Sequence, residues 1–409
     1  MTITNIEPGQ TRPPVSKVSP GQWLKKNLFN TWYNSILTLI SLWLIYWVAS
    51  NLITWAASQA QWQVLNDNFR LFFVGRYPVK SLWRAWTTLG VIVGLGGISW
   101  GILAHAASVL FNRRILIVLT IVAATCVAVA IPGGIQSSVI LLLMLMLLII
   151  SAIGGKQLGK KFPDLIGWLP LIWLLAFWFN LWLLLGANSF RLEKSSGLML
   201  TIPIAIVSIV LCFPFGILLA LGRQSNLPAI RWLSVAYIEI VRGFPLIGIL
   251  FTAQVMLPLV LPPDVRPDRV VRAIAGFTIY SAAYLAENVR GGLQSIPHGQ
   301  TEAAKALGLN PAYTLGFIVL PQALKAVIPS TVGQFIALFK DTSLLAIVGL
   351  TDLLGMSQSI IANPKYLGRY GEVYLFVATI YFLCCYSMSL VSRRLEKQQP
   401  FLTVAISDG

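Results

Sequence analysis

The sequence predicts an all-α integral membrane protein with about ten transmembrane helices, and three observations lead to this prediction. Apolar residues make up 56% of its 409 residues and charged residues 11%, whereas soluble domains contain roughly 45–50% and about 25%. From Ser35 onward long apolar runs recur, and several reach the roughly 20 residues that a helix needs to cross a bilayer. The runs are continuously apolar instead of alternating, which favours helices over a barrel.

The predicted spans form two groups of five, divided by a polar connector at 187–196. The first group lies near 34–55, 86–111, 115–131, 138–153 and 166–186. The second group lies near 196–221, 235–261, 270–290, 325–349 and 372–391. We therefore expect a cytoplasmic tail over 1–33, an N-terminal membrane extension over 34–190, a membrane core over 191–392 and a cytoplasmic tail over 393–409.

Basic residues predict the orientation, because cytoplasmic loops are enriched in Lys and Arg. If ten spans alternate, both tails and most basic connectors fall on one side, which we assign to the cytoplasm: Arg113, Arg114, Lys156, Lys160, Lys161, Arg223, Arg231, Lys305, Lys325, Arg393, Arg394 and Lys397. The opposite side also holds basic residues, Arg70, Arg76, Lys80, Arg84, Arg266, Arg269 and Arg272, so the distribution is a bias. The polar first 30 residues lack a signal-peptide pattern, so we expect a retained first span.

Composition disfavours two other classes of protein. The net charge of +16 does not indicate nucleic-acid binding, because the basic residues lie mainly in connectors between apolar runs. The four Cys residues lie inside apolar runs without a CxxC pair or a nearby His, which disfavours metal or redox chemistry. We expect no catalytic residue and no metal site.

The aromatic, amphipathic segment 56–85 leaves two alternatives open. It lies either in the outer membrane interface, where aromatic side chains favour the headgroup level, or in an ordered extracytoplasmic loop.

The segment 291–325 is far less apolar than the spans beside it. Residues 300–307 favour a helix, Gly308 offers a helix stop, and Asn310-Pro311 offers the start of a second short helix. We expect a helix-turn-helix at the cytoplasmic surface. Its small residues form a face on which another protein can dock closely: Ala303, Ala304 and Gly308.

The spacing in this segment resembles the EAA loop of bacterial ABC-importer permeases, EAA-x3-G-x9-I-x-L-P. Every fixed position is present: Glu302, Ala303, Ala304, Gly308, Ile318, Leu320 and Pro321. The resemblance implies that a coupling loop over 293–325 docks in a groove of a separate ATPase subunit. It also implies a type I ABC-importer permease core of five helices, preceded here by the N-terminal helical extension.

Flanking residues narrow the resemblance to permeases of polar amino-acid importers. Segments 237–246, 287–292 and 339–344 are similar to three segments of that subfamily, and the similarity covers 196–392. Phe244 departs from the small residue usual at its position, which puts the packing of that bend in question. The N-terminal half resembles, more weakly, the extension of the longer permease subunits of general L-amino-acid importers, through 72–78 and 83–84.

The resemblance implies a permease that moves polar or general L-amino acids across the bacterial inner membrane. The implied partners are two copies of an ABC ATPase that bind ATP and Mg, a periplasmic solute-binding protein, and a second permease, either a shorter homologue or another copy of this chain. Segment 154–161 resembles a phosphate loop, but Lys161 replaces the Mg-binding Ser or Thr and no strand precedes it. We expect a basic cytoplasmic loop there and no ATP site in this chain.

Ionisable residues at membrane depth are costly and are therefore functional candidates. Glu239 and Arg242 are three residues apart, as are Glu287 and Arg290, so each pair could meet on one helix face. Each pair belongs either to a substrate pathway or to a local ion pair that lets a helix end tolerate charge.

The pair Lys340-Asp341 interrupts the ninth apolar run. It predicts either a broken helix that lines a cavity or a short extracytoplasmic turn between two helices. An amino-acid substrate needs partners at both ends, and we expect Glu287 and Asn288 to receive its ammonium. The candidates for the substrate pathway are Glu239, Arg242, Glu287, Asn288, Gln334, Lys340, Asp341 and Ser343.

Two other functions remain open at this point. One is a secondary amino-acid transporter driven by ions, in which the intramembrane charges form a proton relay. The other is a membrane receptor or scaffold. The docking loop separates an ATP-driven importer from the ion-driven transporter, because a substitution at Gly308 uncouples ATP hydrolysis from uptake only in the importer. Uptake by the purified complex in liposomes separates a transporter from a receptor or scaffold.

Overall fold

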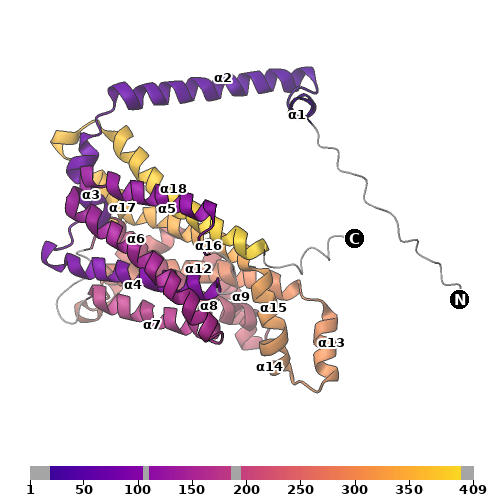
Figure 1. Ribbon diagram of the computed structural model, residues 1–409. Helices are drawn as coiled ribbons and strands as arrows, with labels where there is room; N and C mark the ends of the chain where they lie inside the picture. The colour runs from indigo at the N-terminus through magenta and orange to yellow at the C-terminus, as the bar shows by residue number, and fades with distance from the viewer. Residues whose placement is uncertain (1–18, 105–109, 186–194, 398–409) are drawn as a thin grey trace. The chain divides into compact units, whose positions relative to one another are not determined.

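Figure 1 shows the computed structural model, which describes residues 19–104, 110–185 and 195–397. Within these ranges the elements are helices and no strand is present, which confirms the predicted all-α class. The chain forms two compact units, Met1–Gln61 and Trp62–Gly409. Most of the predicted connector at 187–196 lies outside the described residues.

The first unit contains α1 (Pro20–Asn27), α2 (Trp32–Thr54) and the π-helix η1 (Trp55–Gln59). Ser19 caps α1 by accepting a hydrogen bond from the backbone N–H of Gln22 at 3.3 Å. None of the residues of α2 is buried. A helix that is apolar on every side is suited to lipid, and the run Trp32–Gln59 is long enough to cross a membrane.

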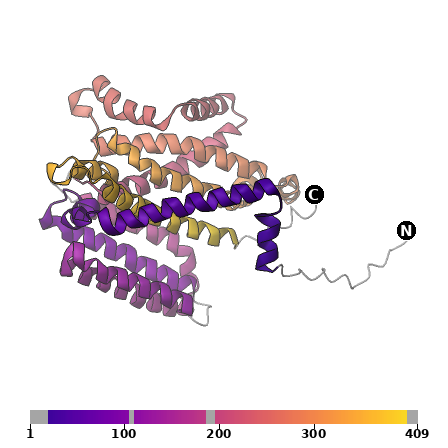
Figure 2. The ribbon, with the colours of Figure 1, turned by 90° about the horizontal axis from the view of Figure 1, so that it is seen from above.

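The second unit begins with the rest of the predicted extension. Its elements are α3 (Gln63–Val74), η2 (Val79–Ser81), α4 (Leu82–Leu103), α5 (Arg113–Ala128), α6 (Ala130–Lys161) and α7 (Leu165–Leu185). Figure 2 shows these helices, drawn in purple, beside the orange and yellow helices of the core.

Glycine residues let α4 and α6 pack closely. A Cβ atom at Gly101 would overlap the backbone of Ala152 and Gly155, and one at Gly155 would overlap the carbonyl oxygen of Ile98. Membrane helices commonly pack through small residues of this kind. Segment 154–161 therefore forms the last turns of α6, and the basic loop expected there is wrong.

The core and the loop region follow in the second unit. Their elements are α8 (Leu198–Arg223), α9 (Pro228–Gly243), α10 (Leu246–Phe251), η4 (Thr252–Met256), α11 (Leu257–Val260), η5 (Pro263–Val265), α12 (Arg269–Gln294), α13 (His298–Ala306), α14 (Pro311–Tyr313), η6 (Thr314–Val319), α15 (Leu320–Ala326), α16 (Ile328–Asp341), η7 (Thr342–Ala346), α17 (Leu353–Ile361), η8 (Pro364–Tyr366) and α18 (Tyr370–Lys397).

Two of the predicted core spans are bent instead of straight. The chain turns by 102° between Pro228–Gly243 and Leu246–Val260, and by 59° between Pro311–Ala326 and Ile328–Ala346. Pro245 and Pro329 explain the two breaks, because proline lacks the N–H of a continuing helix and clashes with the preceding turn. The first bend therefore divides the predicted span 235–261, and the second lies at the start of the predicted span 325–349.

Within the described ranges, six helices are long and apolar enough to cross a membrane, or up to eight if each bent pair forms one span. The charged helix α12 and the shorter α5 stand at two further predicted positions. A helix or bent pair therefore lies at each of the ten predicted positions within the described ranges.

The structure shows that part of segment 56–85 is a helix packed on the core. Val64 and Phe72 of α3 belong to one buried apolar cluster with residues of α17 and α18. Asp67 accepts hydrogen bonds from Lys365 Nζ and from the hydroxyl of Tyr366, both at 2.7 Å. The bond from Lys365 first, then that from Tyr366 and a third from Gln63, lower the pKa of Asp67 from its usual range to about 2.

The turn after α3 interlocks with the start of α8. Gly75 has φ 56° and Gly197 has φ 67°, a region that L side chains rarely adopt. A Cβ at Gly75 would overlap Ser196, whose hydroxyl accepts a hydrogen bond from the N–H of Arg76 at 2.7 Å. The extension and the core are therefore joined through α3 within the second unit.

Candidate functional site

The first half of the predicted loop is α13, which ends in a tight turn. Gly308 has φ 77°, its N–H donates to the carbonyl of Lys305 at 2.9 Å, and the N–H of Leu309 donates to the carbonyl of Ala304 at 3.1 Å. This pair of bonds is the Schellman arrangement, which needs a residue in the left-handed region after the helix. The helix stop predicted at Gly308 is confirmed.

The second half of the loop returns to the membrane through α14, η6 and α15. The side chain of Asn310 accepts a hydrogen bond from the N–H of Tyr313 at 2.9 Å, and Pro311 occupies the first turn. Both features match the predicted helix start. Pro321, which has no N–H to donate, lies in the first turn of α15, two residues after the π-helical stretch Thr314–Val319 ends.

The predicted docking residues differ in exposure. Glu302, Ala303, Gly308 and Pro321 are exposed, whereas Ile318 and Leu320 are half-buried. Ala304 is 3% exposed and packs inside the chain. Ala304 is therefore not part of the expected small-residue docking face. It is buried because α13 packs against the rest of the loop region through this residue.

Three large apolar side chains are exposed on this loop, and we call them the apolar patch. They are Leu307, Tyr313 and Phe317, at 82%, 54% and 69% exposure. The rings of Tyr313 and Phe317 lie 5.6 Å apart between centroids. None of the three was among the predicted docking residues, although an apolar residue next to the helix-ending glycine and two aromatic residues four apart in a polar loop are signals that the sequence contains.

Beside the loop, five charged residues from three helices form a charge cluster. Glu287 of α12 pairs with Arg290 on its own helix, with Arg242 of α9 at 3.5 Å and with Arg223 of α8 at 3.4 Å. Arg223 also pairs with Glu239 of α9 at 3.0 Å. The cluster therefore ties together the C-terminal parts of α8, α9 and α12.

The cluster confirms one predicted pairing and corrects another. Glu287 and Arg290 do meet on one helix face. Arg242, however, turns to Glu287 and stacks over the ring of Tyr284 at 5.5 Å, while Glu239 turns to Arg223. The expected Glu239–Arg242 pair is wrong because helix packing offers each side chain a partner on a neighbouring helix.

The remaining candidates lie elsewhere in the core. α16 ends at Asp341 and a 3₁₀ turn follows, so a helix break occurs where Lys340-Asp341 predicted one. Asn288, Gln334 and Ser343 are half-buried on α12, α16 and η7. Among the described residues, no ion pair joins Lys340 or Asp341 to the charge cluster.

The long apolar helices of the described residues define a class, the polytopic helical membrane proteins. Comparison with known sequences makes the class specific. Residues 212–399 match the family described as binding-protein-dependent transport system inner membrane component.

Two relatives cover nearly the whole chain. The inner membrane amino-acid ABC transporter permease protein YhdY of Escherichia coli (strain K12) is 36% identical over 92% of this chain and 92% of its own length. The glutamate/glutamine/aspartate/asparagine transport system permease protein BztC of Rhodobacter capsulatus is 36% identical over 94% of this chain and 95% of its own length. The chain belongs to this family of amino-acid ABC transporter permeases, and it is a multi-pass protein of the inner membrane.

A solved structure matches half of the chain. It is described as the crystal structure of an amino acid ABC transporter with histidines, and it matches 50% of this chain and 92% of its own chain at 28% identity and a TM-score of 0.46.

Proposed function

We infer that this chain is the membrane-spanning permease subunit of an ABC importer that carries amino acids across the bacterial inner membrane. The observation that carries the inference is the loop Pro297–Ala326: it has the complete docking motif, a rigid Schellman turn and an exposed apolar patch. Isolated apolar patches on a polar loop are typical of protein-docking surfaces.

The apolar patch and the exposed Glu302 and Ala303 form the socket for a separate ATPase subunit. Two ATPase copies bind ATP and Mg and supply the energy, and this chain carries out no chemical step. Leu307 and Phe317 are the anchors, because large buried side chains contribute most of the binding energy in protein interfaces. In this arrangement the loop and both termini lie in the cytoplasm.

The charge cluster transmits movement of the loop to the spans. α13 follows α12 after only three residues, and Arg290 also hydrogen-bonds Gln294 at 2.8 Å near the end of α12. Because Glu287 is shared by arginines of α8, α9 and α12, displacement of α12 carries the ends of the other two helices with it. This linkage is a means by which ATPase closure moves the permease between two states.

In the conformation of this structure, Glu287 is proposed to hold α8, α9 and α12 together and not to bind a substrate ammonium. Its carboxylate is contacted by three guanidinium groups. The path of the amino acid is proposed to run along the bent core helices, near Asn288, Gln334, Lys340, Asp341 and Ser343. A second permease completes the path, and a periplasmic solute-binding protein delivers the substrate.

The test is amino-acid uptake and ATP hydrolysis by the complete transporter in proteoliposomes. Leu307→Glu combined with Phe317→Glu places charge in the socket and should abolish ATPase binding and reduce uptake at least tenfold. Leu367→Glu is the matched control, since Leu367 is 68% exposed on η8–α18 and outside the loop. Full ATP-driven uptake by the double variant would refute the inference, and uptake driven by an ion gradient without ATPase would favour a secondary transporter.

A further inference from the structure

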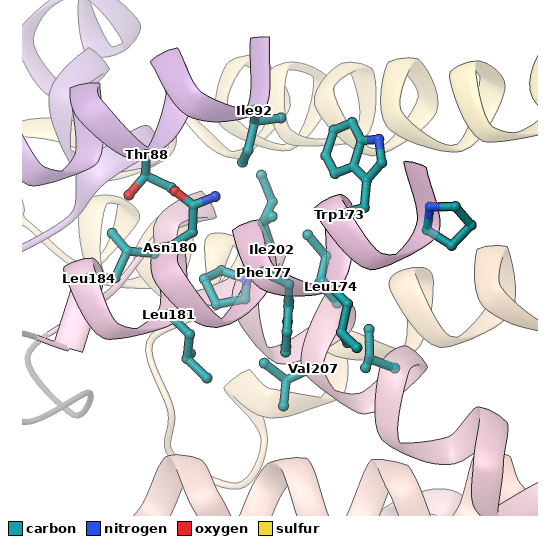
Figure 3. A pocket seen from close by; sticks show the side chains of 14 residues that line it. Thr88, Ile92, Trp173, Leu174, Phe177, Asn180, Leu181, Leu184, Ile202 and Val207 are labelled. Atoms are coloured by element: carbon teal, nitrogen blue, oxygen red, sulfur yellow. The ribbon is translucent and has the colours of Figure 1, made fainter. Parts of the chain in front are cut away.

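A cavity of about 430 Å³ lies between α4, α7 and α8, away from the loop and the charge cluster. Figure 3 shows its lining, which is almost wholly apolar. α7 is tethered to α4 by a hydrogen bond from Trp173 Nε1 to Ser99 Oγ at 3.0 Å. Pro203 of α8 and Pro170 of α7 also line the cavity.

Two buried polar groups lie at one end of this cavity. Thr88 and Asn180 are each 9% exposed, and Thr88 Oγ1 and Asn180 Oδ1 have no hydrogen-bond partner among the described residues. Figure 3 shows the two side chains facing each other across the cavity end, with Trp173 at the opposite end. A buried polar atom without a partner costs free energy, so its persistence on a cavity wall points to a ligand.

The lengths of the helices show at which depth of a bilayer the pair lies. Thr88 lies six residues after the start of α4 and Asn180 five residues before the end of α7, which is about 7–9 Å along each helix. The 26 residues of α8 span about 39 Å, against roughly 30 Å of hydrocarbon. The polar pair therefore lies in the leaflet away from the loop, at the end of the cavity nearer the headgroups.

The rest of the cavity runs from this pair toward the bilayer centre. Its α8 lining extends from Ile202 to Val210, or about 6–18 Å from the start of the helix. Water is a poor occupant, because each water molecule needs two to four polar partners and the volume equals about 14 water molecules at about 30 Å³ each. One hydrocarbon chain of a single leaflet fits both the depth and the walls.

We propose that this cavity is a binding site for a phospholipid of the surrounding bilayer, with one acyl chain between α4, α7 and α8 and its ester group at Thr88 and Asn180. The Thr88 hydroxyl donates to the ester carbonyl. The Asn180 amide does so once it is turned about its Cβ–Cγ bond, which exchanges oxygen and nitrogen without changing shape. The lipid then joins the extension helices α4 and α7 to α8 of the core.

The test measures phospholipid retained by the purified complete transporter, by mass spectrometry after exhaustive detergent exchange and after rebinding from vesicles of phosphatidylethanolamine and phosphatidylglycerol. Val207→Trp fills the cavity and should remove the retained lipid. Leu175→Trp, on the lipid-facing side of α7 at 62% exposure, should leave it in place. Thr88→Val combined with Asn180→Leu should weaken retention about tenfold, as expected for lost hydrogen bonds.

Equal retention by the unsubstituted complex and Val207→Trp would overturn the proposal. A second measurement uses the unsubstituted complex in nanodiscs with phospholipid brominated on its acyl chains. Electron density for a brominated chain between α7 and α8 supports the site. Density for one water molecule between Thr88 and Asn180 alone, or for another protein segment in the cavity, overturns it.

Discussion

Arg242 Nη1 lies 3.5 Å from Glu287 Oε2 on a neighbouring helix, although Glu239 is only one turn away on its own helix. The consequence is that Glu287 is the centre of the charge cluster and Glu239 is peripheral. The side chain of Glu287 is 23% exposed and that of Glu239 is 55% exposed. These two carboxylates therefore provide a matched pair for testing the cluster.

Glu287→Gln should destabilise the transporter by about 1–3 kcal/mol and lower uptake, because three arginines lose their shared countercharge in a largely buried site. Glu239→Gln should cost less than about 1 kcal/mol, since exposed ion pairs contribute little. Thermal unfolding of the purified complex and uptake in proteoliposomes measure both effects. Equal losses of thermal stability and of uptake in the two variants would show that Glu287 is not the centre of the charge cluster.

Gly308→Ala should reduce the uptake obtained per ATP hydrolysed. The left-handed conformation costs an L residue about 1–2 kcal/mol, and φ at Gly308 is 77°. A Cβ atom at Gly308 would meet no other atom within 4 Å. The substitution therefore tests the backbone conformation of this residue and not steric overlap with its neighbours. Gly308→Asn should retain more coupling, because Asn tolerates this conformation. Gly299→Ala, inside the preceding helix α13 and also with open space around it, should behave as the unsubstituted protein.

Gly155→Ala should destabilise the α4–α6 contact by about 1–3 kcal/mol, because the added methyl group would overlap the carbonyl oxygen of Ile98. The neighbouring Gly154 has nothing within 4 Å of an added Cβ, so Gly154→Ala should be neutral or slightly stabilising. Unfolding of the two variants in the same detergent provides the comparison. Similar midpoints for both would argue against close packing at Gly155.

Because the carboxyl of Asp352 is buried, we expect the stability of the folded protein to depend on pH. Burial raises the pKa of the Asp352 carboxyl to about 6. The hydrogen bonds that this carboxyl accepts from the N–H groups of Gly355 and Leu354, at the start of α17, lower the pKa but do not offset the effect of burial. The raised pKa means that the folded state holds the proton more tightly. The stability gained from protonation is present below about pH 4 and is lost as the pH rises through about 6.

Asp352→Asn should remove this dependence while keeping an acceptor for the helix cap. Between about pH 4 and pH 7 the unsubstituted protein should lose about 3 kcal/mol relative to the variant, since each pKa unit corresponds to about 1.4 kcal/mol. Chemical unfolding of the purified complex at several pH values measures the difference. Parallel pH profiles for the two proteins would exclude a titrating Asp352.

Local sequence signals predicted the loop well. Gly308, Asn310 and Pro311 act through their own backbone or their nearest turns, and all three take the conformations that the sequence indicates. The span positions were also predictable, because a bilayer sets the required length and polarity of a helix. The bends at Pro245 and Pro329 were available from the same rules.

Contacts between helices were not predictable in the same way. Arg223 was identified only as a basic connector residue, and its pairing with Glu239 and Glu287 depends on how α8, α9 and α12 pack. Spacing within one helix suggested the wrong partner for Glu239. The glycines at 154–159 suggested a loop, yet Gly155 is explained by the approach of α4 from a distant part of the chain.

The position of α3 has a consequence for biogenesis. α3 is made early, but its buried partners Met356, Val373 and Val377 and the ion-pair partner of Asp67, Lys365, follow almost 300 residues later. The ribosome must therefore complete nearly the whole chain before this helix can bury Val64 and Phe72. We therefore expect α3 to be among the last elements of the subunit to pack. Incomplete chains then expose the apolar face of α3, which quality-control proteases can recognise.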